Sequence, residues 1–354
     1  MKDFLIIGQG IAGSILAFEL LHRHQTVVVI DNAHQGSSSI VAAGILNPVT
    51  GKRFTITENY DRLFFQAVSF YHEMERLFGQ PFFELKPIVR IFQHEEERAY
   101  WLKHAEQSAG QHYVEQLNPP YTFSPHVDDP FGSILITSSG FCHSARLLGA
   151  FQHYFQERHV LKTEMFSYEH LKVEKDHIVY GGEKYGRVIF CEGYQAQFNP
   201  WFKWIPFQPV KGEILKIAMD ETGLPSAIIH KGKWAVPLGD GEWTAGSNYI
   251  WDKINGEPTE EGRNEILESL QAALNRKIEV SQHQAGVRMA TTDQKPVLGL
   301  HPEHPVLGIL NGFSSKGFLM APTYAPQLAR FLCDEGIIDE AVALTRYLDK
   351  IRKI

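Results

Sequence analysis

The feature that most constrains the fold is an ordered series of short segments near the N-terminus. Residues 3–7 form an apolar run that predicts a buried strand, and three glycines at Gly-x-Gly-x-x-Gly spacing follow within residues 8–13. Apolar residues then recur at helical spacing over residues 14–22, and a second apolar run, residues 26–30, ends in Asp31. A strand, glycine turn, helix and strand in this order predict a βαβ unit with a parallel sheet.

Each glycine of this motif has a physical role. Gly8 makes the tight turn, Gly10 lets the backbone approach a pyrophosphate, and Gly13 lets the helix pack closely on the strand. The helix start offers N–H groups and a positive dipole end to the phosphates. Asp31 stands where an acid accepts a hydrogen bond from a ribose hydroxyl, so the motif predicts a dinucleotide with a free 2′-hydroxyl, FAD or NAD rather than NADP.

The composition indicates a folded chain with no general attraction to nucleic acids or anionic membranes. Hydrophobic residues make up 44% of the 354 residues, and 34 basic against 41 acidic residues give a formal net charge of -7. At this length about two domains are expected. The charge disfavours a nucleic-acid partner, and no segment has the length and apolarity that integral membrane contact requires.

Cysteine and histidine usage favours a reducing compartment and disfavours a metal site. The three cysteines, Cys142, Cys191 and Cys333, stand far apart without a Cys-x-x-Cys pair. The 17 histidines include no His-Glu-x-x-His motif and no cluster at ligand spacing. We therefore expect a cytoplasmic protein with no bound metal.

Five segments together resemble one enzyme family over nearly the whole chain. They are the glycine motif with Asp31, and residues 37–48, 187–193, 209–213 and the C-terminal pair 285–299 with 311–317. The later segments hold a serine-rich loop ending in Ala-Gly-Ile-Leu-Asn-Pro, an apolar strand ending in Cys-Glu-Gly, and the sequences Pro-Val-Lys-Gly-Glu, Ala-Gly-Val-Arg and Asn-Gly-Phe-Ser-Ser-Lys-Gly. In this order and spacing they are similar to the FAD-dependent oxidoreductases of the D-amino-acid oxidase superfamily, nearest to the glycine oxidase and sarcosine oxidase branch.

The resemblance implies that the dinucleotide is FAD. One dinucleotide motif is present, as a flavin oxidase needs, and no second one is found for NAD. Gly286 stands where the family has its covalent flavin cysteine, so we expect FAD to be bound non-covalently. The residues expected to bind FAD are Gly8, Gly10, Ile11, Ala12, Gly13, Asp31, Ser38, Ser39, Ala43, Gly44, Leu46, Gly193, Gly312, Phe313, Ser314, Ser315, Lys316 and Gly317.

The resemblance also implies an α/β fold in which two domains are interleaved along the chain. A Rossmann-like FAD-binding domain would comprise residues 1–78, 140–200 and 285–354. A second, α+β substrate domain on a mostly antiparallel sheet would comprise residues 79–139 and 201–284. Strand patterns over residues 210–218, 233–237 and 243–247, and a helix start at Thr259, fit this second domain.

The implied reaction is oxidation of the C–N bond of an amino acid or secondary amine. Hydride transfer to flavin N5 gives an imine that water hydrolyses, so the protein's main task is to orient the substrate. Arg288 matches the arginine that binds the substrate carboxylate in the glycine oxidase branch, and a guanidinium suits a carboxylate through two parallel hydrogen bonds. Tyr249, near a predicted strand end, is a second pocket candidate. The implied partners are a small carboxylate-bearing substrate and oxygen or another electron acceptor.

Departures from the family leave the substrate and the acceptor open. Leu319 and Thr244 stand where the sarcosine oxidase branch has a substrate-binding and an oxygen-activating lysine, and Ser315 replaces an arginine of glycine oxidase. The alternatives are an FAD-dependent 2-hydroxy-acid dehydrogenase, which Arg288 would serve equally, a tRNA-modifying amine oxidase, and a non-catalytic flavin-binding protein. The net charge of -7 disfavours the tRNA-modifying enzyme.

Three further segments carry predictions, and the first two have no clear counterpart in the family. The basic pair Lys52 and Arg53 would either bind a second anionic group or face solvent. The aromatic residues between 198 and 207 fit a core better than a wall of the flavin pocket. Residues 337–354 show helical spacing with a basic end, which predicts an amphipathic helix.

Overall fold

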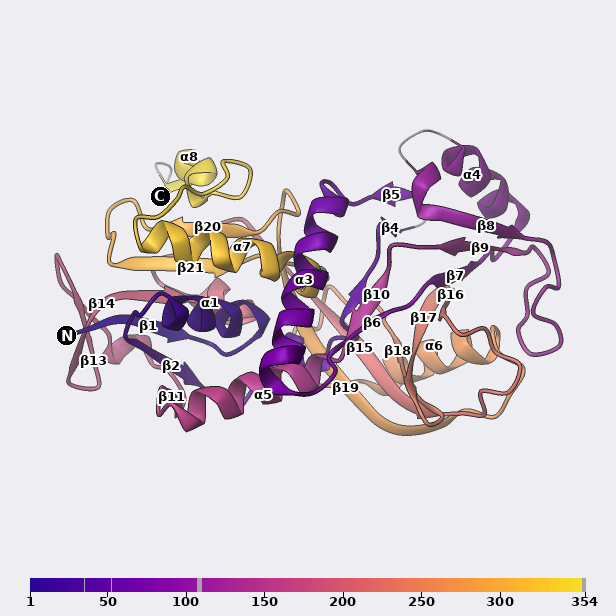
Figure 1. Ribbon diagram of the computed structural model, residues 1–354, viewed down its shortest axis with the longest axis horizontal. Coiled ribbons are helices and arrows are strands. Elements are labelled where there is room, and N and C mark those ends of the chain that lie inside the picture. Colours follow the sequence, from indigo (N-terminus) through magenta and orange to yellow (C-terminus); the bar gives the residue numbers. More distant parts are fainter. Residues whose placement is uncertain (35, 52, 107–109, 352–354) are drawn as a thin grey trace. The chain divides into compact units, whose positions relative to one another are not determined.

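The computed structural model describes residues 1–34, 36–51, 53–106 and 110–351, and the chain divides into two compact units (Figure 1). The first unit comprises Met1–Ile40, Ser144–Val210 and Val287–Ile354, and the second comprises Val41–His143 and Lys211–Gly286. Among the described residues, no helix has the length and apolarity needed to cross a membrane.

The first unit is built on an eight-stranded sheet. Its strands are β1 (Lys2–Ile7), β2 (Val27–Asp31), β11 (Leu161–Thr163), β12 (Lys172–Val173), β13 (Ile178–Tyr180), β14 (Glu183–Phe190), β20 (Val297–Leu300) and β21 (Leu307–Asn311). The strands β11, β2, β1, β14 and β21 lie side by side and run parallel, whereas β13 and β20 pair antiparallel with β14 and β21. The predicted βαβ unit with a parallel sheet is therefore confirmed.

Helices and short turns complete the first unit. They are α1 (Ile11–His22), α2 (Ser38–Val41, which reaches the second unit), α5 (Ser144–Glu157), α7 (Gly317–Leu332), α8 (Leu348–Ile351) and the 3-10 turns η2 (Tyr168–His170), η3 (Gly193–Phe198) and η4 (Leu344–Tyr347). Figure 1 shows α1 and α7 packed side by side, and α1 also contacts α5. Because α1 packs against helices as well as strands, most of its residues are buried, and the buried ones are apolar or small.

The aromatic segment between residues 198 and 207 belongs to the core of the first unit. Phe202 and Trp204 are buried in one cluster with Leu5 of β1 and Phe190 of β14. Trp201 and Phe207 pack against that cluster, whereas Phe198 is 59% exposed. The interpretation of this segment as core is right. Because the segment belongs to the first unit, the division expected after residue 200 falls after residue 210 instead.

The second unit holds another sheet of eight strands, which is mostly antiparallel. In spatial order these are β19 (Glu279–Thr291, which continues into the first unit), β15 (Phe207–Ala218, which enters from the first unit), β18 (Glu242–Gly246), β17 (Lys233–Gly239), β16 (Ile228–Lys231), β7 (Ile88–Ile91), β9 (Ser133–Ile136) and β8 (Val114–Asn118). A small sheet joins β3 (Ile45–Leu46), β10 (Gly140–Cys142) and β6 (Phe83–Leu85), and β4 (Val49–Thr50) pairs with β5 (Thr55–Ile56). The helical elements are α3 (Tyr60–Phe78), α4 (Glu95–Ala105), α6 (Glu260–Gln271) and η1 (Gln111–Tyr113).

Helix α6 begins where the sequence predicts it. The Thr259 hydroxyl accepts a hydrogen bond of 3.1 Å from the N–H of Gly262, which caps the helix start. Its apolar face buries Ile266 and Leu270 in the core of the large sheet, together with Trp243 of β18. The α/β fold with a Rossmann-like unit and a second, mostly antiparallel unit is confirmed.

A larger difference from the expected boundaries concerns residues 41–78. The sequence assigns residues 41–78 to the cofactor-binding domain, whereas they lie in the second unit. Leu46 of β3 pairs with Gly140 of β10, and the Tyr60 hydroxyl at the start of α3 donates a hydrogen bond of 2.6 Å to the carbonyl of Ser138. These long-range contacts tie the segment to its own unit, and no local pattern in the sequence reports them.

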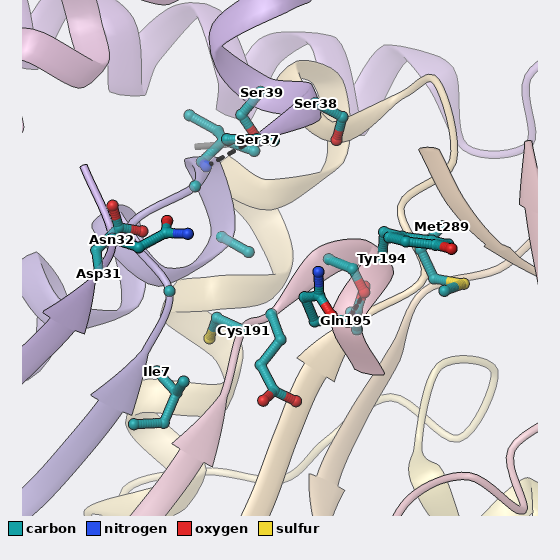
Figure 2. Close-up of a pocket in the computed structure, with 18 of the residues that line it drawn as sticks. Ile7, Asp31, Asn32, Ser37, Ser38, Ser39, Cys191, Tyr194, Gln195 and Met289 are labelled. Carbon is teal, nitrogen blue, oxygen red and sulfur yellow. Dashed lines mark hydrogen bonds between the residues drawn. The ribbon is translucent and has the colours of Figure 1, made fainter. Parts of the chain in front are cut away.

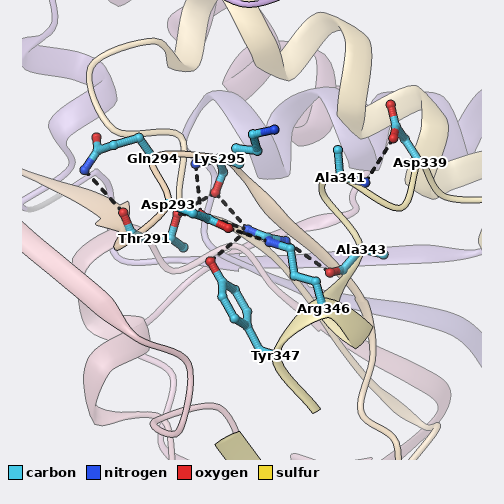
Figure 3. Close-up of polar contacts among 9 residues, drawn as sticks. All are labelled: Thr291, Asp293, Gln294, Lys295, Asp339, Ala341, Ala343, Arg346 and Tyr347. Atoms are coloured by element: carbon cyan, nitrogen blue, oxygen red, sulfur yellow. Dashed lines mark hydrogen bonds and ion pairs between the residues drawn. The ribbon is translucent and has the colours of Figure 1, made fainter. Parts of the chain in front are cut away.

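The predicted C-terminal helix over residues 337–354 is wrong. Residues 336–343 contain no helix, only η4 and the short α8 follow, and residues 352–354 lie outside the described residues. Polar contacts hold this segment instead (Figure 3). The Arg346 guanidinium donates to Asp293 at 2.9 Å and to the carbonyl of Lys295 at 3.1 Å, and the N–H of Leu298 donates to the carbonyl of Val342.

Candidate functional site

The glycine motif forms a tight turn between β1 and α1. Gly8 has a left-handed φ of 97°, and its N–H donates a hydrogen bond of 2.8 Å to the carbonyl of Ile30 in β2. A Cβ at Gly13 would lie 1.9 Å from the carbonyl oxygen of Gly8, so only glycine allows α1 to begin this close to the strand. Gly10 supplies no side-chain cap to α1, and the N–H of Ile11 donates to the Ser39 hydroxyl at 3.2 Å.

Asp31 lies at the end of β2, held by backbone groups. One carboxylate oxygen accepts a hydrogen bond of 2.8 Å from the N–H of Gln9, and the other accepts one of 2.6 Å from the N–H of His34. The first contact ties the acid to the glycine turn. Figure 2 shows Asp31 and Asn32 on one side of a cavity and Ser37, Ser38 and Ser39 beside them.

The cavity has a volume of about 390 Å³ and lies within the first unit. Volumes of this size are typical of small-molecule and cofactor sites. Figure 2 shows Cys191, Tyr194, Gln195 and Met289 around it, on other segments than Asp31. The cavity therefore lies beyond the carboxyl ends of the parallel strands β1, β2 and β14, the edge at which open α/β sheets bind ligands.

Eleven of the predicted cofactor-binding residues line this cavity. They are Gly8, Gly10, Ile11, Ala12, Asp31, Ser38, Ser39, Gly193, Phe313, Ser314 and Gly317. The structure also explains why the motifs meet, since Asn311 donates a hydrogen bond of 2.9 Å to the carbonyl of Gly193. Ser314, at a left-handed φ of 53°, donates from its N–H to the carbonyl of Met289 at 2.9 Å.

The other predicted cofactor-binding residues do not line the cavity. Gly13, Gly312, Ser315 and Lys316 belong to the first unit, and Ala43, Gly44 and Leu46 belong to the second. Gly44 has a local reason to be glycine, because its φ is 68° and a Cβ there would lie 2.0 Å from the carbonyl oxygen of Cys142. Burial lowers the pKa of Lys316, which precedes the first residue of α7.

Sequence reasoning missed part of the cavity wall. The missed residues include Asn32, Glu164, Met165, Phe166, Tyr168, Cys191, Glu192, Tyr194, Gln195, Val287, Met289 and Asn311. Five of these, Cys191, Glu192, Val287, Met289 and Asn311, lie inside the segments that carry the family resemblance, and that position was the available signal. Residues 164–168 carry no motif, and they reach the cavity because β11 pairs with the end of β2.

Glu192 is the most unusual group in this wall. Its carboxylate accepts a hydrogen bond of 2.6 Å from the Tyr168 hydroxyl and one of 3.0 Å from the Asn199 amide. Burial raises the pKa of Glu192 to about 7, although both hydrogen bonds lower it.

The two predicted substrate residues lie in different units. Arg288 is half-buried in β19 within the first unit, between Val287 and Met289, which both line the cavity. Because side chains alternate along a strand, the Arg288 side chain points to the opposite face of β19 from these two neighbours. Tyr249 lies in the second unit, 60% exposed, in the segment after β18. Of the family departures, Thr244 is buried in β18 and Leu319 is buried in α7.

Hydrogen bonds to two buried charged residues of β15 hold the segment that carries Tyr249. Lys211 and Glu213, in the predicted Pro-Val-Lys-Gly-Glu segment, have fully buried side chains whose charged atoms lie 3.3 Å apart. The backbones of Lys211 and Ile250 exchange two hydrogen bonds of 3.0 Å. Glu213 also accepts hydrogen bonds from the N–H and the hydroxyl of Thr259. Both ends of residues 248–259 are thereby attached to β15.

The remaining sequence candidates contribute less to the site. Lys52 lies outside the described residues, and Arg53 is exposed. Within the described part of the chain, no three His, Cys, Asp or Glu side chains come together in a way that could hold a metal ion.

Comparisons with a family model, with curated proteins and with solved structures agree on one family. The model of the family described as FAD dependent oxidoreductase (DAO) matches residues 3–330. The chain is 23% identical, over 94% of its length, to the tRNA 5-methylaminomethyl-2-thiouridine biosynthesis bifunctional protein of Marinobacter nauticus, of whose length it spans only 55%. It is 25% identical to glycine oxidase of Pseudomonas putida, with 96% of this chain and 97% of that protein covered. The solved structure of glycine oxidase from Geobacillus kaustophilus has the same fold, with a TM-score of 0.81 at 20% identity over 98% of both chains.

Proposed function

Because the chain belongs to this family of FAD-dependent oxidoreductases, we propose that it oxidises the C–N bond of a carboxylate-bearing amino acid or secondary amine with non-covalently bound FAD. The observation that carries the proposal is the cavity beyond the carboxyl ends of β1, β2 and β14, which the glycine turn and Asp31 line. Arg288, on the opposite face of β19 from its lining neighbours Val287 and Met289, is the candidate substrate anchor that the resemblance to the glycine oxidase branch implies. Oxidation of an amino acid needs a carboxylate anchor beside the cofactor. Similarity to glycine oxidases supports this substrate class.

The residues around the cavity fit FAD. A Cβ at Gly10 would lie 3.1 Å from the Ser39 hydroxyl, so a side chain there would fill the space that a diphosphate needs beside the turn. The start of α1, to which the N-cap residue Gly10 contributes no side chain, presents its positive dipole end to an anion. Asp31, at the end of β2, is in the position of the acid that accepts a hydrogen bond from a ribose hydroxyl. Gly286, in place of the family's cysteine, supports non-covalent binding.

In this proposal the main task of the protein is to bind FAD and the substrate and to orient the substrate towards FAD. FAD held by the glycine turn and Asp31 would supply the hydride acceptor for the C–H bond next to the substrate nitrogen, and water would hydrolyse the resulting imine. The Arg288 guanidinium binds the substrate carboxylate through two parallel hydrogen bonds and so fixes the direction of the reacting C–H bond. The turn at residues 312–317 begins α7, whose positive dipole end favours negative charge nearby.

The proposal is tested by anaerobic bleaching of the flavin absorbance. The purified holoprotein is mixed with amino acids, N-methyl amino acids and 2-hydroxy acids in turn. Bleaching by an amine with a carboxylate supports the proposal, bleaching by hydroxy acids alone replaces it with a 2-hydroxy-acid dehydrogenase, and bleaching by none favours a non-catalytic flavin-binding protein. Admission of air then shows whether oxygen reoxidises the flavin.

Arg288→Ala should raise KM for the substrate found in that panel by more than tenfold. Each charged hydrogen bond to the carboxylate contributes about 1.5–3 kcal/mol, and a loss of about 1.4 kcal/mol already corresponds to tenfold. Arg288→Lys, which keeps the charge but loses the planar fork, should give an intermediate KM. FAD content measured by absorbance controls for folding, and an unchanged KM in Arg288→Ala would refute the anchor role.

A second candidate substrate is an amine carried on a tRNA nucleotide. The similarity to the tRNA 5-methylaminomethyl-2-thiouridine biosynthesis protein favours it, whereas the net charge of -7 does not. Adding bulk tRNA to the anaerobic panel separates the two candidates. Bleaching by tRNA and by no free amino acid would establish this second candidate.

A further inference from the structure

The charged side chains in the cavity wall are all acidic. The described lining residues include three carboxylates, Asp31, Glu164 and Glu192, and no lysine or arginine. Arg288 and Lys316 stand next to lining residues in the chain but are not among them. The FAD diphosphate carries two negative charges, so its binding here brings a dianion into a wall that already repels it. Backbone N–H groups at the start of α1 offset part of this cost, and neutralising one carboxyl group would offset more.

Glu192 is the carboxyl group whose surroundings favour neutralisation. It follows β14 and is held in place by the Tyr168 hydroxyl at 2.6 Å and the Asn199 amide at 3.0 Å. The Tyr168 ring packs against Phe166 and Trp201, at ring-centre distances of 5.4 and 6.3 Å. Aromatic surroundings disfavour a charge, and both hydrogen-bond donors are neutral.

The titratable groups that face Glu192 do not supply a compensating charge. Tyr168 faces it from η2 and Cys191 from the end of β14, and burial together with the charge of Glu192 raises the pKa of both. Burial likewise raises the pKa of Glu192 to about 7, against the effect of its two hydrogen bonds. The Asp31 carboxylate, also in the wall, accepts its hydrogen bonds from the backbone N–H groups of Gln9 and His34.

We propose that Glu192 is a cofactor-binding residue that binds FAD in its protonated, neutral form, so that FAD binding takes up one proton from solvent at this carboxyl group. A neutral carboxyl group can donate a hydrogen bond to FAD while its oxygens accept from Tyr168 and Asn199. Binding then weakens as the pH rises above the range in which free Glu192 is protonated. The inference concerns cofactor binding and is independent of which substrate the enzyme oxidises.

Calorimetric titration of the flavin-free protein with FAD tests this. Proton uptake is measured at pH 8 in two buffers of different ionisation enthalpy, and Kd for FAD is measured from pH 6 to pH 9. With a pKa of about 7 in the free protein, wild type should take up about 0.9 proton at pH 8. Its Kd should rise nearly tenfold from pH 8 to pH 9.

Two variants of the wall provide the comparison. Glu192→Gln should bind FAD without proton uptake, with a Kd that no longer depends on pH and at pH 8 is no weaker than that of wild type. Glu164→Gln, the matched change of another lining carboxyl group, should keep the uptake. Equal uptake in wild type and Glu192→Gln, or no uptake in wild type, would overturn the proposal.

Tyr168→Phe keeps the test decisive if Glu192→Gln folds poorly. The Tyr168 hydrogen bond lowers the pKa of Glu192, so its removal should move the whole uptake curve to higher pH. A curve that stays in place or moves to lower pH in this variant would contradict the assignment.

Discussion

Gly13 and Gly149 form a matched pair of glycines inside helices, and replacing each by alanine should change stability in opposite directions. Gly13 is buried in α1, whereas Gly149 is exposed in α5. Around Gly149 no atom outside the helix's own backbone lies within 4 Å of an added Cβ. Gly149→Ala should therefore gain helix propensity, up to about 1 kcal/mol of unfolding free energy.

The same change at Gly13 would place the new Cβ against the backbone of the glycine turn. The added Cβ would lie 1.9 Å from the carbonyl oxygen of Gly8 and 3.1 Å from the Cβ of Cys191. Carbon and oxygen atoms in contact lie about 3.3 Å apart, so the turn and the helix would have to separate by about 1.4 Å. Overpacking costs about 1–3 kcal/mol, and the upper end applies here because a backbone carbonyl cannot rotate away. We expect Gly13→Ala to lose about 2 kcal/mol or more after the gain in propensity.

Urea denaturation of the two variants and wild type, followed by circular dichroism, measures this difference. Flavin absorbance after gel filtration reports FAD retention, which should fall in Gly13→Ala because the displaced turn is the one that would bind the diphosphate. Gly149→Ala controls for the general effect of alanine in a helix. If Gly13→Ala unfolded at the wild-type urea concentration and retained FAD, close packing would not be the reason for glycine at this position.

Two further predictions concern the second unit. Glu213→Gln should lower the free energy of unfolding by about 3–5 kcal/mol, because it leaves the buried Lys211 ammonium without its charge partner. Urea denaturation beside Glu279→Gln, which breaks an exposed pair and should change little, checks this, and equal effects of the two changes would contradict it. Burial and the nearby charge of Arg90 lower the pKa of His230 in the folded protein to about 3. In the unfolded chain this histidine binds a proton at about pH 6.5, well above the pH at which the folded protein does. Stability should therefore fall as the pH drops from about 6.5 towards 3. His230→Gln should flatten the decline of Tm between pH 7 and pH 4, and an equally steep decline would rule His230 out as its source.

The residues found from the sequence share a local requirement. Gly8 must adopt a left-handed φ directly after a strand, and Gly13 must let a helix start against that strand, so both needs appear within a few residues. The same holds for Thr259, whose capping hydrogen bond reaches only as far as Gly262. Patterns of this range are visible in the sequence because the contacting groups are neighbours in it.

The residues that sequence reasoning missed depend on distant partners. Glu192 stands beside the predicted Gly193, yet its character comes from Tyr168, 24 residues earlier, and from the aromatic rings around that tyrosine. The family resemblance placed residues 41–78 in the cofactor-binding domain, whereas the pairing of β3 with the distant β10 links them to the second unit. The tail after residue 336 has helical spacing, but its polar contacts with Asp293 and Lys295 hold it in another form.

The sequence by itself determined the βαβ unit, because the glycine turn carries its geometry locally. The resemblance of its motifs to one family, in their order along the chain, predicted FAD and two interleaved domains. Only the tertiary structure decided which side chains face the cavity, where the domain seams fall and how a carboxyl group such as Glu192 is surrounded. Those properties are set by burial and by contacts between segments far apart in the chain. Desolvation, which raises the pKa of Glu192, exists only once such segments have packed together.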